Sequence, residues 1–153
     1  MIAETSTGIT YTAIPGTIGS TTVTADNTIV NSLTSLSLQL LPAHNLPTNS
    51  VIKITLPNEL DIVDRATDAC TLENLKVLQN ALVCAVSSRV ITITSPFAST
   101  YVPSSTEVIS FTINQVTMPS STAPTGDYVF ESFIDEGGST LYYVDKSTVS
   151  DLF

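Results

Sequence analysis

Aliphatic and polar residues alternate with a period of two along much of this chain, and this feature most constrains its fold. Leu36, Leu38 and Leu40 are separated by Ser37 and Gln39. The same period recurs at Ile52, Ile54 and Leu56, at Ile91 and Ile93, and at Ile109, Phe111 and Ile113. Because successive side chains of a strand point to opposite faces, the pattern predicts strands with one buried and one exposed face.

Further strands are expected where β-branched and aromatic residues lie between turn residues. These are Gly8 to Ile14, Ser20 to Ala25, Leu82 to Val86, Tyr128 to Ile134 and Thr140 to Val144, and the turn from Asp135 to Gly138 predicts a hairpin between the last two. Only Thr71 to Gln79 has helical character. The sequence therefore predicts an all-β fold, an antiparallel Ig-like β-sandwich of about eight to ten short strands, in a single domain spanning residues 1–153.

The charge balance narrows the classes of partner. The net charge is -9 and the five Lys and Arg residues are scattered, so no basic stripe is present for nucleic acid. Charged residues make up only 12% of the chain, whereas Ser and Thr make up roughly a quarter, so hydroxyl groups supply most of the polar surface. No apolar run approaches a membrane span, so no membrane insertion is expected. This composition favours an extracellular or cell-surface protein.

The two cysteines, Cys70 and Cys84, fit an oxidising compartment. We expect them to form a disulfide that closes a loop of about 15 residues. The alternative is a pair of buried free thiols. One cysteine pair and a distant histidine supply too few ligands for zinc, so no metal is expected.

Two residues could suggest covalent chemistry. Lys53 lies in a strand whose period turns it away from Ile52 and Ile54, so it is expected outside the core, where it could not form an intramolecular isopeptide bond. His44 is the only histidine and precedes a turn at Pro47, which favours a turn or surface role. Serines are too abundant to indicate a nucleophile, so we expect neither an enzyme nor a cofactor.

Acidic and hydroxyl-rich runs fall in expected turns. Asp61, Asp64 and Asp68, like Asp135 and Glu136, lack the ordered spacing of a calcium loop and are interpreted as solvated turn residues. Two runs containing proline are candidates for O-linked sugars, with unmodified loops as the alternative. Their hydroxyl residues are Ser104, Ser105, Thr106, Ser120, Ser121, Thr122 and Thr125.

Several motifs together resemble one repeat of the large surface proteins of ciliates. They are the strand LPTNSVIKITLPNEL, the central cysteine pair, the turn MPSSTAPT and a closing hairpin that ends near Asp145, Lys146 and Ser147. The resemblance covers roughly Leu33 to Thr148, and each motif is also common strand and turn chemistry. It implies a surface module whose neighbours are copies of itself or similar modules.

The first twenty residues bear on how such modules would join. Ile9, Tyr11 and Ala13 alternate with threonines and are separated from the leucine-rich strand by a polar stretch. Such a segment suits a donor or linker strand that pairs with a neighbouring module, although it could also be the first strand of its own sandwich. We therefore expect a structural subunit or repeat of an extracellular filament or surface coat. The alternative is an adhesin-type module that binds a glycan or protein partner, with Tyr101, Tyr142 and Tyr143 as its aromatic candidates.

Overall fold

The computed structural model describes residues 14–19, 21–72, 78, 82–137 and 140–150. These residues form strands and connecting loops, and the alternating segments that lie within the described residues form strands. The strands are β1 (Gly16–Thr17), β2 (Thr21–Ala25), β3 (Leu33–Leu40), β4 (Ser50–Thr55), β5 (Asp61–Ile62), β6 (Cys70–Leu72), β7 (Val83–Ser87), β8 (Val90–Thr94), β9 (Ile109–Thr117), β10 (Tyr128–Asp135) and β11 (Leu141–Val149).

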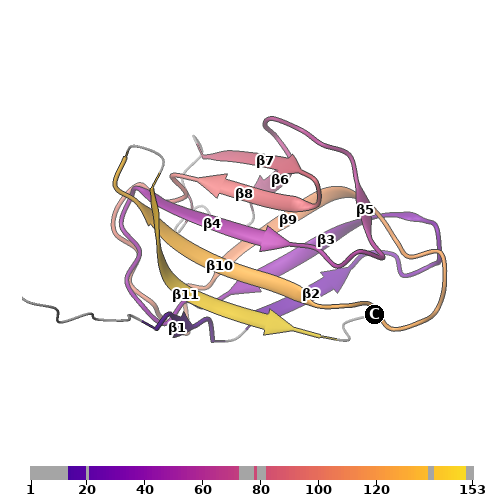
Figure 1. The fold of residues 1–153 in the computed structure, drawn as a ribbon, viewed down its shortest axis with the longest axis horizontal. Coiled ribbons are helices and arrows are strands. Elements are labelled where there is room, and N and C mark those ends of the chain that lie inside the picture. Colours follow the sequence, from indigo (N-terminus) through magenta and orange to yellow (C-terminus); the bar gives the residue numbers. More distant parts are fainter. Residues whose placement is uncertain (1–13, 20, 73–77, 79–81, 138–139, 151–153) are drawn as a thin grey trace, which may run out of the picture.

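The strands form two facing sheets (Figure 1). The six-stranded sheet has the order β1-β11-β10-β4-β8-β7, and the second sheet has the order β2-β3-β9-β5, with β6 also paired to β9. The all-β fold and its two sheets are as predicted. The finer Ig-like assignment stays a prediction. One pair departs from the antiparallel expectation, because β1 runs parallel to β11.

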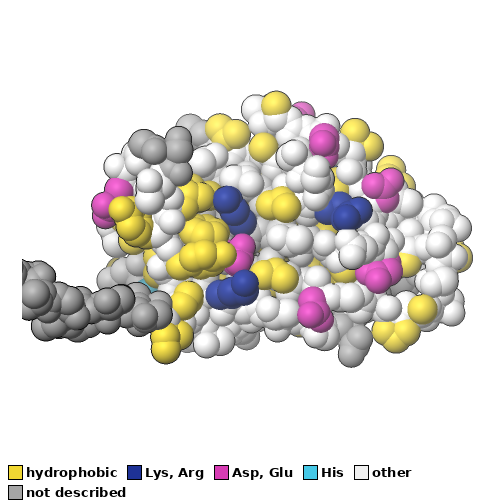
Figure 2. Space-filling view, in the orientation of Figure 1, with side chains coloured by type: hydrophobic (Ala, Val, Ile, Leu, Met, Phe, Trp, Pro, Cys, Tyr) yellow, Lys and Arg dark blue, Asp and Glu magenta, His cyan; other side chains and the backbone are white. Residues whose placement is uncertain are grey.

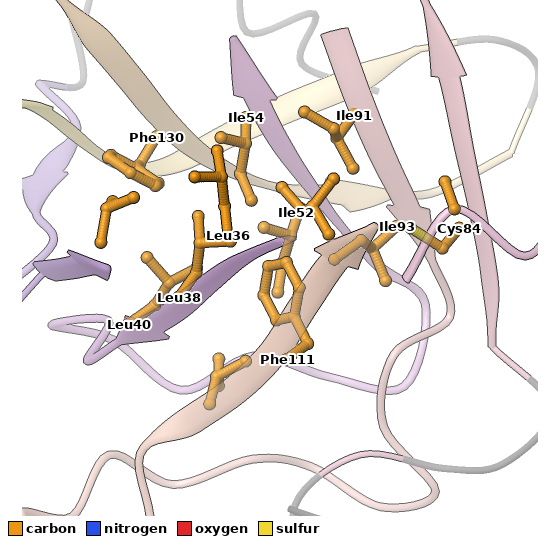
Figure 3. Close-up of a cluster of buried hydrophobic side chains, with 14 of the residues drawn as sticks. Leu36, Leu38, Leu40, Ile52, Ile54, Cys84, Ile91, Ile93, Phe111 and Phe130 are labelled. Carbon is orange, nitrogen blue, oxygen red and sulfur yellow. The ribbon is translucent and has the colours of Figure 1, made fainter. Parts of the chain in front are cut away.

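The core lies between the sheets. It consists mainly of the residues whose alternation in the sequence predicted a buried position. Leu36 and Leu38 of β3 and Ile52 and Ile54 of β4 are at most 1% exposed. They pack with Ile91 and Ile93 of β8, Phe111 of β9 and Phe130 of β10 (Figure 3). Each such side chain contributes about 1.5–3 kcal/mol when fully buried, so this interdigitated layer is the main source of stability.

One long side of the sandwich is closed by chain that crosses from sheet to sheet. Arg65 exchanges backbone hydrogen bonds with Val86 of β7, at 2.9 and 2.7 Å. Ala69 N donates to Cys84 O of β7, and Ala69 O accepts from Asn114 N of β9. The disulfide between Cys70 of β6 and Cys84 of β7 joins the two sheets on this side.

The part of the chain expected to have helical character is only partly described. Thr71 and Leu72 belong to strand β6, which corrects the expectation for these two residues. Both pair with β9, at Thr112 and Phe111. This pairing outweighs the helical preference of the segment, because contacts with a neighbouring strand routinely override local helix propensity. Most of the remainder, up to Gln79, lies outside the described residues.

Candidate functional site

Among the described residues, the opposite long side of the sandwich is open, and both sheets end there in strands with uncovered edges. In the part of the chain that the structure describes, β2 pairs only with β3, and the outer edge of β11 pairs only with β1. An uncovered strand presents a row of backbone N–H and C=O groups to any further strand that approaches. The open side is therefore the part of this molecule best suited to strand addition.

β11 is nine residues long, yet β1 covers little of it. Gly16 and Thr17 pair with Asp145 and Lys146, and Ile18 N donates to Lys146 O at 3.3 Å. Ile18 is 3% exposed and belongs to the core. Residues 16–18 are therefore part of this sandwich, which corrects the expectation that the whole of residues 1–20 forms a donor or linker segment.

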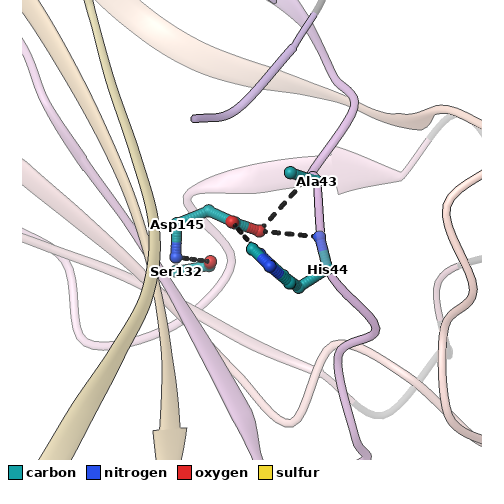
Figure 4. Close-up of polar contacts among 4 residues, drawn as sticks. All are labelled: Ala43, His44, Ser132 and Asp145. Atoms are coloured by element: carbon teal, nitrogen blue, oxygen red, sulfur yellow. Dashed lines mark hydrogen bonds and ion pairs between the residues drawn. The ribbon is translucent and has the colours of Figure 1, made fainter. Parts of the chain in front are cut away.

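A buried carboxyl group lies next to Gly16 of β1, at the middle of this edge. Asp145 is 0% exposed, and its Oδ2 accepts hydrogen bonds from the backbone N–H groups of Ala43 and His44, at 3.1 and 3.2 Å (Figure 4). Asp145 Oδ1 lies 2.6 Å from His44 Nδ1. Burial of a polar group is tolerated when such partners replace water. The contact joins the β3–β4 loop to β11, directly under Gly16.

The serine that bonds to the backbone of Asp145 does not complete a nucleophilic triad with His44. Ser132 Oγ accepts a hydrogen bond from the backbone N–H of Asp145 at 3.1 Å, and Ser132 is 1% exposed. The Ser132 hydroxyl thus bonds to the backbone of Asp145 within the sheet. The His44 imidazole, 59% exposed, lies on the other side of Asp145, in the β3–β4 loop. This arrangement joins one loop, between β3 and β4, to the strands β10 and β11, and it lacks the serine-histidine contact of a nucleophilic triad.

The outer face of the six-stranded sheet beside β11 carries an aromatic pair. Tyr143 packs on Phe133 of β10 with ring centroids 4.3 Å apart, and Lys53 Nζ lies 5.1 Å from the Phe133 ring centroid. Lys53 therefore points outward, as alternation predicted. Figure 2 shows this face, with a cluster of hydrophobic side chains beside two cationic side chains that flank an acidic one.

Glu131 organises the charges next to this pair. Its Oε1 accepts from Tyr143 OH at 2.7 Å and lies 3.1 Å from Lys146 Nζ. The hydrogen bond to Glu131 raises the pKa of Tyr143 above its ordinary value, with smaller contributions from burial and from the charge of Glu131. The hydrogen bond to Glu131, followed by its negative charge, also raises the pKa of Lys146. Both groups therefore keep their protons at neutral pH.

The three tyrosines proposed as binding candidates differ in how far the structure exposes them. Tyr101 is 5% exposed and stacks on Phe97 with ring centroids 5.2 Å apart, so it is a core residue. Tyr142 and Tyr143 are 53% and 52% exposed, so they are available at the end of β11 nearest the hairpin. Their exposed rings form a surface that a partner can reach beside the uncovered edge of β11.

The candidate glycosylation residues lie mainly in accessible loops. Ser105, Thr106, Ser120, Ser121 and Thr122 are exposed, and Ser104 is half-buried. Thr125 is the exception, because its side chain is 2% exposed and its hydroxyl is enclosed. We therefore withdraw Thr125 from the candidates, since a sugar on that oxygen would require the loop to open.

Four further predictions concern the disulfide, the assembly residues, metal binding and membrane insertion. The disulfide is formed, as predicted for Cys70 and Cys84. The assembly residues Ile9, Tyr11 and Ala13 lie outside the described residues. Among the residues that are described, no group of three or more His, Cys, Asp or Glu side chains is arranged to hold a metal ion. The same residues contain no helix long and apolar enough to cross a membrane.

Neither a family model nor a curated protein matches the chain. Among solved structures it is similar to BslA, a bacterial hydrophobin, at 17% identity, 86% coverage of this chain, 93% of that chain and a TM-score of 0.39. It is also similar to the human F-spondin reeler domain, at 12% identity, 90% and 92% coverage and a TM-score of 0.39. Likenesses at these scores carry no argument about function. The resemblance to ciliate surface repeats stays a prediction.

Proposed function

We propose that the chain is a structural subunit or repeat of an extracellular filament or surface coat whose modules join by strand pairing. The observation that carries this proposal is the open side, where β2 and most of the outer edge of β11 are uncovered among the described residues. A strand supplied by a neighbouring module would complete the backbone hydrogen bonds there and place alternate side chains on each face.

The closed side and the cysteines support the same proposal. A disulfide between the two sheets suits a protein that works outside the cell, where thiols are oxidised. It also ties β6 to β7 on the closed side, where Arg65 and Ala69 already bond to the backbone of β7. A module closed on one side and open on the other adds strands in one defined place, which favours ordered assembly over indiscriminate aggregation.

The donor in this proposal is the N-terminal segment that carries Ile9, Tyr11 and Ala13. It precedes β1 in the chain, and β1 already pairs with β11. Pro15 lies between the segment and β1 and has no N–H group to donate, so it interrupts regular pairing at that point. Ile14 is 87% exposed and contributes little to its own core. The segment is therefore suited to pair outside its own module.

Electron microscopy of the purified chain, with and without residues 1–13, tests this function. We expect filaments or sheets from the full chain and dispersed particles from the shortened one at equal concentration. Both must unfold at a similar temperature, because the described core begins after residue 13. Dispersed particles from both chains at every concentration would refute assembly through this segment.

An adhesin-type function is the second candidate, and one observation favours it. The exposed ring of Tyr143 bonds through its hydroxyl to Glu131, which pairs with Lys146, so this site supplies both hydrogen-bond donors and acceptors. Tyr142, the preceding residue, is also exposed. Such a surface suits a glycan or a protein partner. A glycan array probed with the full chain and with Y143A tests this function, which is refuted if no glycan distinguishes the two proteins.

A further inference from the structure

A small apolar pocket lies at the end of the sandwich away from the start of the described chain. It has a volume of about 210 Å³. Its walls come from the β2–β3 loop and the β9–β10 loop, and its lining is Thr28, Val30, Met118, Pro119, Ser121, Thr122 and Ala123. None of these residues is charged. An apolar cavity of roughly 150 Å³ binds a benzene ring, so this pocket has room for a large apolar side chain.

Backbone hydrogen bonds hold the two walls of the pocket together. Met118 N donates to Ser32 O at 2.9 Å, and Asn31 N donates to Pro119 O at 3.0 Å. Within the β2–β3 loop, Ile29 N donates to the side-chain oxygen of Asn27 at 3.0 Å. The pocket is thus formed before any occupant arrives, which lowers the entropic cost of binding.

Exposed apolar side chains are concentrated around this pocket. Nine large hydrophobic side chains of the described chain are exposed, and three of them, Ile29, Val30 and Leu33, lie within five consecutive residues, of which Val30 lines the pocket. They are 67%, 40% and 63% exposed. Apolar side chains gathered at a concave site indicate an interaction surface, whereas single exposed ones do not.

The described chain begins at the other end of the sandwich. Figure 1 places β1 at one end of the long axis, and the β2–β3 and β9–β10 loops at the opposite end. Ile14, next to β1, is 87% exposed. At least 13 residues precede it, and that length spans up to about 45 Å when extended, enough to reach an adjacent molecule. The segment contains apolar residues at Ile2, Ile9 and Tyr11.

We propose that the pocket between the β2–β3 and β9–β10 loops binds an apolar side chain from the N-terminal segment of a second copy. This inference rests on the proposed assembly and identifies its acceptor site. Donor and acceptor lie at opposite ends, so the contact is heterologous and each added copy presents a new pocket. Val30 and Met118 form the apolar walls, and the uncovered edge of β2 leads directly into the same loop.

The experiment compares full-length variants that differ at the acceptor and at the donor. V30E introduces a charge into the pocket wall, and A123F fills the pocket without a charge. V63E is the matched control, because Val63 is 69% exposed, is not among the pocket-lining residues and changes the net charge equally. The double variant I9E/Y11E removes the apolar donor. Sedimentation measures the concentration at which each protein assembles, and thermal unfolding verifies that each is folded.

We expect V30E and A123F to raise the assembly concentration at least tenfold, and V63E to change it less than twofold. A mixture of V30E and I9E/Y11E should stop at one-to-one dimers, because only one of the four ends can donate and only one can accept. Added alone to the wild-type protein, V30E should terminate chains at low molar ratio, since it donates but does not accept.

The outcomes separate the two proposals. If the wild-type chain assembles and V30E and A123F assemble equally well, the pocket is not the acceptor, although assembly stands. If the wild-type chain remains monomeric at every concentration, an unlabelled peptide of residues 1–14 is titrated onto the isotope-labelled full chain. Chemical-shift changes at Val30 and Met118 then support the pocket while refuting filament assembly, and no changes refute both proposals.

Discussion

At the scale of single residues, the buried carboxyl group of Asp145 decides how the open edge is built. Three polar contacts, from the backbone of Ala43 and His44 and from the His44 ring, replace the water that it loses. His44 was interpreted from the sequence as a turn or surface residue. Its ring is indeed largely exposed, but its partner lies 101 residues away. No local pattern marks such a pair, since the strand period predicts only which face Asp145 occupies.

The packing of Asp145 and His44 leaves no room for a side chain at Gly16. A Cβ atom at Gly16 would lie 2.2 Å from Asp145 Oδ1 and 2.4 Å from His44 Cε1. Asp145 cannot move without losing its hydrogen bonds, so we expect G16A to cost about 1–3 kcal/mol, as overpacking does elsewhere. G126A is the control, because its Cβ would meet nothing closer than 3.4 Å. Thermal unfolding should show a lower midpoint for G16A alone, and equal midpoints would contradict the account.

At the scale of elements, strand alternation predicted most of what the structure contains. Leu36, Leu38 and Leu40 of β3 are buried as their period requires, and so are the isoleucines of β4 and β8. Lys53 of β4 points outward between Ile52 and Ile54. The exceptions occur where pairing is irregular. The register between β10 and β11 shifts at Ser132 and Phe133, so Val144 has no partner in the pairing and Tyr143 packs on Phe133. A bulge of this kind depends on two strands at once, and one strand's sequence does not reveal it.

The disulfide is the element-scale contact whose removal is most informative. It joins β6 and β7, which belong to different sheets, across a sequence separation of 14. A loop of this size constrains the unfolded chain by about 3 kcal/mol, so we expect the double variant C70A/C84A to unfold at a lower urea concentration by a comparable free energy. Wild-type protein reduced with dithiothreitol is the control and should match the variant. A loss below about 1 kcal/mol would show that the unfolded loop is already restricted without the bond.

At the scale of the whole molecule, shape and charge have opposite effects on the assembly of copies. The two ends of the long axis differ, with an exposed Ile14 at one and an apolar pocket at the other, which favours end-to-end addition. The net charge of -9 opposes it, because every copy repels the next. The net charge and the alternation of the N-terminal segment are read directly from the sequence. The sequence did not predict the pocket, because the two loops that line it are far apart in the chain and meet only in the folded sandwich.

The salt dependence of assembly follows from this opposition. Repulsion between copies extends over a Debye length of about 30 Å at 0.01 M salt and about 8 Å at 0.15 M, whereas an apolar contact is not screened. We therefore expect the assembly concentration to fall severalfold between 10 and 150 mM NaCl, measured by sedimentation at pH 7. Sucrose at equal osmolality is the control and should have little effect. If NaCl instead raises the assembly concentration, ion pairs between copies hold the assembly together, and the apolar pocket is not its main contact.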